Sequence, residues 1–215
     1  MVKGIIFDMD GVLFDTEPFY LKRREAFLTS KGIRIDHLSP KDFIGGNLQQ
    51  IWDKVLAEQV TANEARDVAA AYEDYKLCHK PPYQELMFKG VKSCLKALKG
   101  QGLKLALASN SSRCDILLAL ESSHIKAYFD LTLAREDVTA GKPNPEIYNK
   151  AAQALGLAKE ELVVIEDSQK GIAAAKAAGL KVLAIKDKRY GIDQGQADQC
   201  IDSIKQLCEL LRSGS

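Results

Sequence analysis

The sequence lacks long hydrophobic runs, since no uninterrupted apolar stretch approaches the roughly 18 to 20 residues that a membrane-spanning helix needs. Its first ten residues also reach two acids too early for a secretory signal peptide. An excess of one charge is missing as well, because 30 lysines and arginines face 29 acids, for a net charge of +1. These absences predict no membrane span and no broad basic surface for nucleic acid, and we expect a cytoplasmic protein.

Histidine and cysteine are scarce and lack the spacing of metal sites. The three histidines lie far apart, and no Cys-x-x-Cys pair occurs among the five cysteines, Cys78, Cys94, Cys114, Cys200 and Cys208. An odd number of cysteines without such a pair predicts reduced thiols in a cytosolic protein. Repeats and low-complexity tracts are also absent, so 215 residues that are 46% hydrophobic predict a globular protein with a sizeable core.

Short apolar runs alternate with helical patterns along most of the chain. Four runs have the continuous hydrophobicity of strands buried on both faces, at residues 4–7, 103–108, 162–165 and 181–185. Amphipathic or alanine-rich helical patterns lie between or after them, at residues 91–98, 145–155, 171–178 and 204–211. Strands that alternate with single helices predict an α/β fold with a doubly wound, mostly parallel sheet, the Rossmann-like arrangement.

Residues 16–82 break this alternation. They hold no convincing strand, and their hydrophobic spacing is helical, as in the series from Leu48 to Leu56 and in the set Val68, Tyr72 and Tyr75. We therefore expect residues 1–15 and 83–215 to form the α/β core, and residues 16–82 to form a helical domain inserted after the first strand.

Acidic residues follow two of the predicted strands directly. Asp8 and Asp10 flank one residue after the first strand, and Glu166 and Asp167 follow the strand at 162–165. Because the carboxyl ends of parallel strands line the ligand crevice of such a sheet, we expect these carboxylates to converge. Four carboxylates repel one another unless a cation lies among them, and hard oxygen donors suit Mg²⁺. The sequence therefore predicts a magnesium site at this edge.

A hydroxyl, an amide and a lysine are expected at the same edge. Ser109 and Asn110 follow the strand at 103–108, and Lys142 lies in a glycine- and proline-containing loop. Most lysines are simply solvated, but a lysine beside an acidic site is a candidate to hold an anionic substrate.

In this combination the chain resembles the haloacid dehalogenase-like hydrolases, in particular the branch of β-phosphoglucomutase and related small-molecule phosphatases. Four motifs carry the resemblance, in order and on the expected elements: Asp8-Met9-Asp10-Gly11-Val12, Ser109 after an apolar strand, Lys142-Pro143, and Glu166-Asp167-Ser168. The resemblance covers nearly the whole chain, including the insertion.

The resemblance implies phosphoryl transfer through a covalent intermediate. Asp8 would be the nucleophile that forms an aspartyl-phosphate, and Asp10 would act as general acid and then as general base. Ser109, Asn110 and Lys142 would bind the phosphoryl oxygens.

The resemblance also implies how Mg²⁺ is held. The metal ligands would be the carboxylates of Asp8 and Asp167 and the backbone carbonyl of Asp10. Glu166 would either bind the metal directly or contact the residues that do.

The helical insertion corresponds to the family's cap domain, which opens to admit substrate and closes to exclude water. The resemblance implies that six cap residues contact substrate: Thr16, Glu17, Tyr20, Gly45, Gly46 and Asn47. In the mutases the position of Tyr20 is characteristically a histidine, and the turn carries an arginine where this chain has Gln49 and Gln50. These departures favour hydrolysis over mutase activity.

We therefore expect a monomeric, Mg²⁺-dependent phosphatase that hydrolyses a small phosphorylated metabolite, with sugar phosphates as the favoured class. A phosphosugar mutase of the β-phosphoglucomutase type is the alternative, because the core residues are common to both. From another class, a receiver-type phosphorylation switch also combines acids, a hydroxyl and a lysine on a parallel sheet. Such switches lack an acid equivalent to Asp10 and carry no inserted helices.

Overall fold

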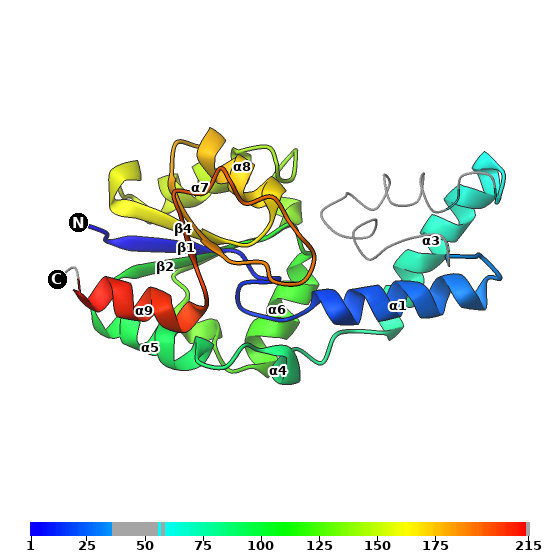
Figure 1. The fold of residues 1–215 in the computed structure, drawn as a ribbon, viewed down its shortest axis with the longest axis horizontal. Helices are drawn as coiled ribbons and strands as arrows, with labels where there is room; N and C mark the ends of the chain where they lie inside the picture. The colour runs from blue at the N-terminus through cyan, green and yellow to red at the C-terminus, as the bar shows by residue number, and fades with distance from the viewer. Residues whose placement is uncertain (36–55, 57–58, 214–215) are drawn as a thin grey trace. The chain divides into compact units, whose positions relative to one another are not determined.

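The computed structural model describes residues 1–35, 56 and 59–213 (Figure 1). The chain divides into two compact units, one formed by Met1–Asp15 and Tyr83–Ser215, the other by Thr16–Pro82. Within the described ranges, no helix combines the length and apolar character that crossing a membrane requires.

The first unit is built on a six-stranded parallel sheet in the order β3-β2-β1-β4-β5-β6. Its strands are β1 Gly4–Phe7, β2 Lys104–Ala108, β3 Leu131–Leu133, β4 Leu162–Glu166, β5 Lys181–Ile185 and β6 Gln199–Ile201. The four strands expected from apolar runs are confirmed, within one residue at each end. The two edge strands escaped prediction because each has only three residues, too few for a hydrophobic pattern.

Helices cover both faces of this sheet (Figure 1). One face packs against α5, α6 and α9, and the other against α7 and α8. Their bounds are α5 Val91–Gly100, α6 Arg113–Ser122, α7 Glu146–Leu155, α8 Gln169–Ala177 and α9 Ile204–Ser213. Alternate strand residues serve the two layers, so Ile5 and Phe7 face the first layer and Ile6 faces the second. The predicted doubly wound α/β fold is therefore confirmed.

Short elements complete this unit. They are α4 Tyr83–Leu86 and the 3₁₀ helices η2 Lys126–Tyr128, η3 Arg135–Asp137 and η4 Lys159–Glu161. Side-chain oxygens start the helices that follow the sheet: Ser112 Oγ accepts from Asp115 N, and Ser168 Oγ accepts from Gly171 N. These caps fix where each chain segment leaves the carboxyl edge of the sheet.

The second unit contains α1 Glu17–Ser30 and α3 Ala62–Cys78. α3 begins with a capping box, in which Thr61 and Glu64 each bond to the other's backbone N–H. The predicted stripe on α3 is confirmed, because Tyr72 is buried against Phe27 of α1, with ring centroids 5.1 Å apart. The segment from Leu48 to Val55 lies outside the described residues.

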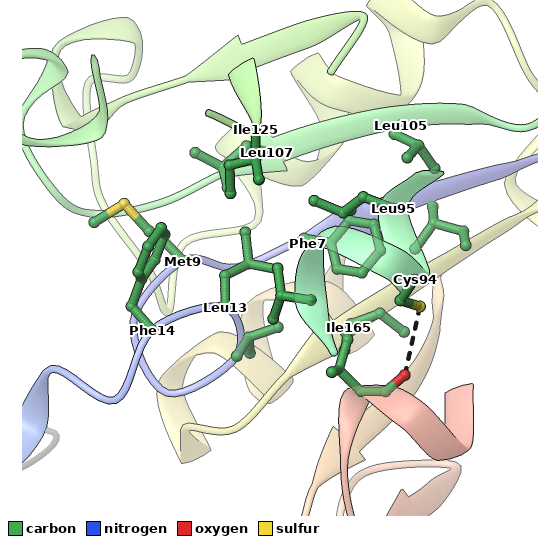
Figure 2. Packing of buried hydrophobic residues seen from close by; sticks show 14 of the residues in the cluster. Phe7, Met9, Leu13, Phe14, Cys94, Leu95, Leu105, Leu107, Ile125 and Ile165 are labelled. Atoms are coloured by element: carbon green, nitrogen blue, oxygen red, sulfur yellow. Dashed lines mark hydrogen bonds between the residues drawn. The ribbon is translucent and has the colours of Figure 1, made fainter. Parts of the chain in front are cut away.

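The prediction of reduced thiols is wrong for two cysteines. Cys94 of α5 and Cys208 of α9 form a disulfide, because these helices lie side by side and bring the two Cα atoms to 5.8 Å (Figure 1). Figure 2 shows Cys94 among the core side chains Phe7, Leu95 and Ile165. Cys94 Sγ also lies 3.5 Å from the carbonyl oxygen of Ile204, to which a thiol, but not a disulfide sulfur, could donate. The 114 residues between the cysteines left no local signal of the pairing.

Removing this disulfide is expected to lower the free energy of unfolding by about 2 to 4 kcal/mol, because the bond restricts the unfolded chain over a long loop. Urea unfolding of Cys94→Ala/Cys208→Ala measures the effect, with Cys200→Ala, an exposed free cysteine, as the control. Alkylation in denaturant without reductant should label three cysteines. Labelling of all five would contradict the disulfide.

Candidate active site

The loop after β1 carries the first acidic pair. Asp8 N donates to Ile165 O, so Asp8 continues the pairing of β1 with β4 before the chain turns. Gly11 makes the turn with a φ of +76°, which glycine adopts without strain. A Cβ on Gly11 would lie 1.9 Å from Asp167 Oδ2, so the absence of a side chain lets Asp167 approach this loop.

Lys142 connects the two acidic segments. Its Nζ donates to Asp8 Oδ1 at 2.6 Å and to Glu166 Oε1 at 2.7 Å. All three side chains are buried, with 8% of Lys142, 8% of Asp8 and none of Glu166 exposed. The structure thus brings together the nucleophile, lysine and acid expected from the sequence, and makes the lysine the counter-charge of two carboxylates rather than a solvated residue.

Side chains of the loop after β2 form hydrogen bonds with Lys142 and with Asp10. Asn110 Oδ1 accepts from Lys142 N at 3.0 Å, and Asn110 Nδ2 donates to Lys142 O at 3.4 Å. Ser109 Oγ accepts from Ser111 N, and Ser111 Oγ donates to Asp10 Oδ2 at 2.7 Å. The Asn110 side chain therefore secures the backbone of Lys142, while Ser111, which sequence reasoning missed, orients Asp10.

Glu166 accepts hydrogen bonds on both carboxylate oxygens. Oε2 accepts from Asp167 N, Ser168 N and Ser168 Oγ at 3.0 to 3.1 Å. Oε1 accepts from Lys142 Nζ and from the phenol of Tyr148 at 2.8 Å. Five donors fix this carboxylate. Tyr148 is a further residue of the site that the sequence patterns did not indicate.

Burial and neighbouring charges shift the pKa values of Asp8 and Glu166 in opposite directions. Burial raises the pKa of Asp8 to about 8, with the charges of Glu166 and Asp10 acting in the same direction and Lys142 opposing them. Burial acts on Glu166 too, but Lys142 and the hydrogen-bond donors outweigh it and lower its pKa. Burial disfavours the charge of Lys142, yet Asp8 and Glu166 together raise its pKa. Lys142 thus outweighs the cost of burial for Glu166 but not for Asp8.

The acidic groups fit a hard divalent cation. Carboxylate oxygens of Asp8, Glu166 and Asp167 lie within 4.8 Å of one another. No described residue donates a hydrogen bond to Asp8 Oδ2, whereas both oxygens of Glu166 accept several. The donor chemistry therefore favours Asp8 over Glu166 as a direct ligand.

Residues of the loop after β5 bind to the segments at the carboxyl edge of the sheet. Gln194 Nε2 donates to the carbonyl oxygens of Asp167 and Ile185 at 2.6 and 2.7 Å. Arg189 forms a two-bond ion pair with Asp15, the last residue of the first segment of this unit. No sequence pattern pointed to the contact of Gln194 with Asp167 or of Arg189 with Asp15, because each joins separate segments of the chain.

The six expected cap residues belong to the second unit. Thr16 precedes α1 and is buried, Glu17 Oε2 lies 3.9 Å from Arg24, and the Tyr20 ring lies 4.9 Å from the Arg23 guanidinium. Gly45, Gly46 and Asn47 lie outside the described residues. Contact of these six residues with a substrate stays a prediction.

Comparison with known proteins identifies relatives of the whole chain. Residues 5–185 match the family model described as haloacid dehalogenase-like hydrolase. A phosphorylated carbohydrates phosphatase of Thermotoga maritima is 32% identical over 186 residues, which are 84% of this chain and 83% of that protein. The pyrophosphatase PpaX of Halalkalibacterium halodurans is 28% identical over 218 residues, or 98% and 97% of the two chains.

A solved structure shares the fold. The β-phosphoglucomutase of Clostridium difficile has a TM-score of 0.78 over 99% of this chain and 96% of that one. At 23% identity this likeness bears on the fold alone.

Proposed function

Since the chain belongs to the haloacid dehalogenase-like hydrolase family, we propose that it is a Mg²⁺-dependent phosphatase of small phosphorylated metabolites, with sugar phosphates as the favoured class. The observation that carries the proposal is the buried contact of 2.6 Å between Lys142 Nζ and Asp8 Oδ1 beside Glu166. It joins a carboxylate nucleophile to a fixed cation. The family match also favours an enzyme over a receiver-type switch.

Asp8 and Asp10 carry the covalent chemistry. A carboxylate oxygen of Asp8 attacks phosphorus, so a new P–O bond forms as the bond to the leaving oxygen breaks, and Asp10 gives that oxygen its proton. Asp10 then takes a proton from the water that attacks the aspartyl-phosphate, which releases inorganic phosphate and restores Asp8. The hydrogen bond from Ser111 Oγ supports this role, because it orients the Asp10 carboxyl group.

Lys142, Ser109 and the backbone amides beside Ser109 and Asn110 hold the phosphoryl oxygens. Negative charge spreads over these oxygens in the transition state, so donors fixed before the reaction stabilise it most. Lys142 is held on its backbone by Asn110 and at its Nζ by two carboxylates, so little ordering is needed when substrate binds.

The proposed metal ligands are the carboxylates of Asp8 and Asp167 and the backbone carbonyl of Asp10. Glu166 orients this set from behind through Lys142 and the Asp167 backbone. When bound, Mg²⁺ offsets the combined negative charge of the carboxylates and the phosphoryl group.

We assign substrate selection to the unit Thr16–Pro82, as a cap with Thr16, Glu17, Tyr20, Gly45, Gly46 and Asn47 in contact with substrate. The relative that is named a phosphorylated carbohydrates phosphatase supports sugar phosphates as the class. We propose a monomer in the cytoplasm. The Cys94–Cys208 disulfide departs from this expectation, because stable disulfides are rare in a reducing cytosol.

The experiment that tests the function is phosphate release from a panel of sugar monophosphates, nucleoside monophosphates and pyrophosphate, with Mg²⁺ and with a chelator. Conversion of β-glucose 1-phosphate to the 6-phosphate is followed in parallel. Mg²⁺-dependent release from a sugar monophosphate is the expected result. Isomerisation without net release would instead make the protein a mutase, and stable phosphorylation without turnover would make it a switch.

Gly171→Ala is expected to lower kcat by about 10²-fold, the scale of a misplacement of about 1 Å at an active site. A Cβ at Gly171 would lie 1.7 Å from Glu166 Oε1, and the five donors on Glu166 prevent an easy shift. Gly100→Ala at the end of α5 is the control, since no atom lies within 4 Å of its added Cβ. Equal kcat values for the two variants would show that the exact place of Glu166 is unimportant.

A further inference from the structure

Tyr148 is buried next to Glu166 and has no role in the phosphoryl transfer described above. It lies in the first turn of α7 and packs in the hydrophobic cluster between α7, α8 and the sheet. Its phenol oxygen nevertheless lies 2.8 Å from Glu166 Oε1, and its ring centroid lies 4.7 Å from Lys142 Nζ. One side chain thus contacts both members of the buried ion pair.

Core packing alone does not require this hydroxyl. A phenylalanine would fill nearly the same volume and keep its ring against Lys142, and a cation over an aromatic face is stabilising without any hydroxyl. Burying a phenol is costly unless it finds a partner, and here the partner is a carboxylate with no exposed surface. The hydroxyl is therefore tied to Glu166 rather than to the packing of α7.

The position of Lys142 Nζ depends on two competing acceptors. Glu166 Oε1 and Asp8 Oδ1 lie 2.7 and 2.6 Å from it. The Tyr148 hydroxyl occupies part of the acceptor capacity of Glu166 Oε1, which weakens the hold of Glu166 on the lysine. The Tyr148 ring also contacts the ammonium group, so Nζ lies among the ring and the two carboxylates.

We propose that Tyr148 is a positioning residue for phosphoryl transfer, whose hydroxyl and ring hold the Lys142–Glu166 pair so that Lys142 Nζ stays directed at Asp8. The inference rests on the proposed function and extends it to a residue outside the four motifs. Tyr148 acts through Lys142 and Glu166 and contacts no reacting atom itself.

Tyr148→Phe tests the proposal, because it removes only the hydroxyl. Its expected effect is a fall in kcat of about tenfold with KM for p-nitrophenyl phosphate within twofold of wild type, since positioning of a charged donor matters most in the transition state. Tyr128→Phe is the matched control, because Tyr128 is half-buried against the cluster on the other face of the sheet. Urea unfolding of each variant shows whether a change in folding accompanies the change in rate.

A second comparison tests whether the effect passes through Glu166. In a Glu166→Gln background, Tyr148→Phe is expected to lower kcat by less than twofold, because residues that act through one contact are not additive. A fall in the free energy of unfolding with kcat unchanged would overturn the inference and leave Tyr148 a structural residue. A fully additive effect in the double variant would overturn it as well.

The wild-type control separates this inference from the proposed function. Wild-type turnover with an unaffected Tyr148→Phe variant overturns the inference alone. Absence of wild-type turnover on any phosphate ester overturns both.

Discussion

Asp8→Asn is expected to lower kcat for phosphate release by about 10⁴-fold or more, the scale seen when a covalent nucleophile is removed. An amide has nearly the same shape as the carboxylate but does not attack phosphorus, so binding should persist while the covalent step is lost. Release is measured with Mg²⁺ on the best substrate of the panel. Wild-type protein quenched during turnover should also carry a hydroxylamine-labile phosphate that the variant lacks.

Asp8→Asn is also expected to raise the free energy of unfolding of the metal-free protein relative to wild type, by an amount that grows as the pH rises. Folding raises the pKa of Asp8 from 3.8 to about 8, so between these values the folded state keeps a proton that the unfolded state has lost. Stability contributed by this group therefore falls as pH rises through the window, and is fully present only below about pH 4. One unit of pKa difference corresponds to about 1.4 kcal/mol, so the loss at pH 8 reaches about 5 kcal/mol at most.

Urea unfolding in a chelator at pH 5, 6.5 and 8 measures this difference. The gap between Asp8→Asn and wild type should widen with pH, and Mg²⁺ should narrow it at pH 8 by binding the folded wild type. Glu166 does not obscure the result, because folding lowers its pKa from 4.5, so its contribution changes mainly below pH 5, the lowest pH measured. A gap that is constant with pH would contradict the assignment, and an active Asp8→Asn variant would remove Asp8 as nucleophile.

The sequence predicted the parts of the fold whose signals are local. The apolar runs at β1, β2, β4 and β5 are buried on both faces, so their hydrophobicity is continuous and easily recognised. The convergence of Asp8 and Lys142 with the Glu166-Asp167 pair was also predictable, since residues after parallel strands meet at one edge of the sheet.

Contacts between distant segments could not be predicted in this way. Cys94 and Cys208 look like ordinary apolar residues of two amphipathic helices, and only the packing of α5 on α9 pairs them. Tyr148 follows Ile147 on the buried side of α7, so its sequence pattern indicates core packing and says nothing about its hydroxyl. Such residues emerge only when the fold is known, because their partners are set by tertiary structure.

Lys142→Met is expected to lower the free energy of unfolding of the metal-free protein by about 3 to 5 kcal/mol, the scale for breaking a buried ion pair from one side. Methionine keeps an unbranched stem of similar length, so a cavity does not explain the loss. What remains is the buried negative charge of Glu166, whose pKa is lowered, without its counter-charge and beside Asp8, whose pKa is raised. The loss should shrink at acid pH, where the carboxylates take up protons.

Lys176→Met is the matched control, because Lys176 pairs with Asp198 where both side chains are about one-third exposed. Exposed ion pairs contribute about 0 to 1 kcal/mol, so this variant should unfold almost like wild type. Equal losses for the two variants would show that Lys142 is not the counter-charge of the site.

At a temperature where both variants are folded, Lys142→Met should still lose about 10²- to 10³-fold in kcat, the scale for removing one donor to a transition-state oxygen. A loss of that size in fully folded protein separates the catalytic charge of Lys142 from its structural one, because unfolding cannot account for it.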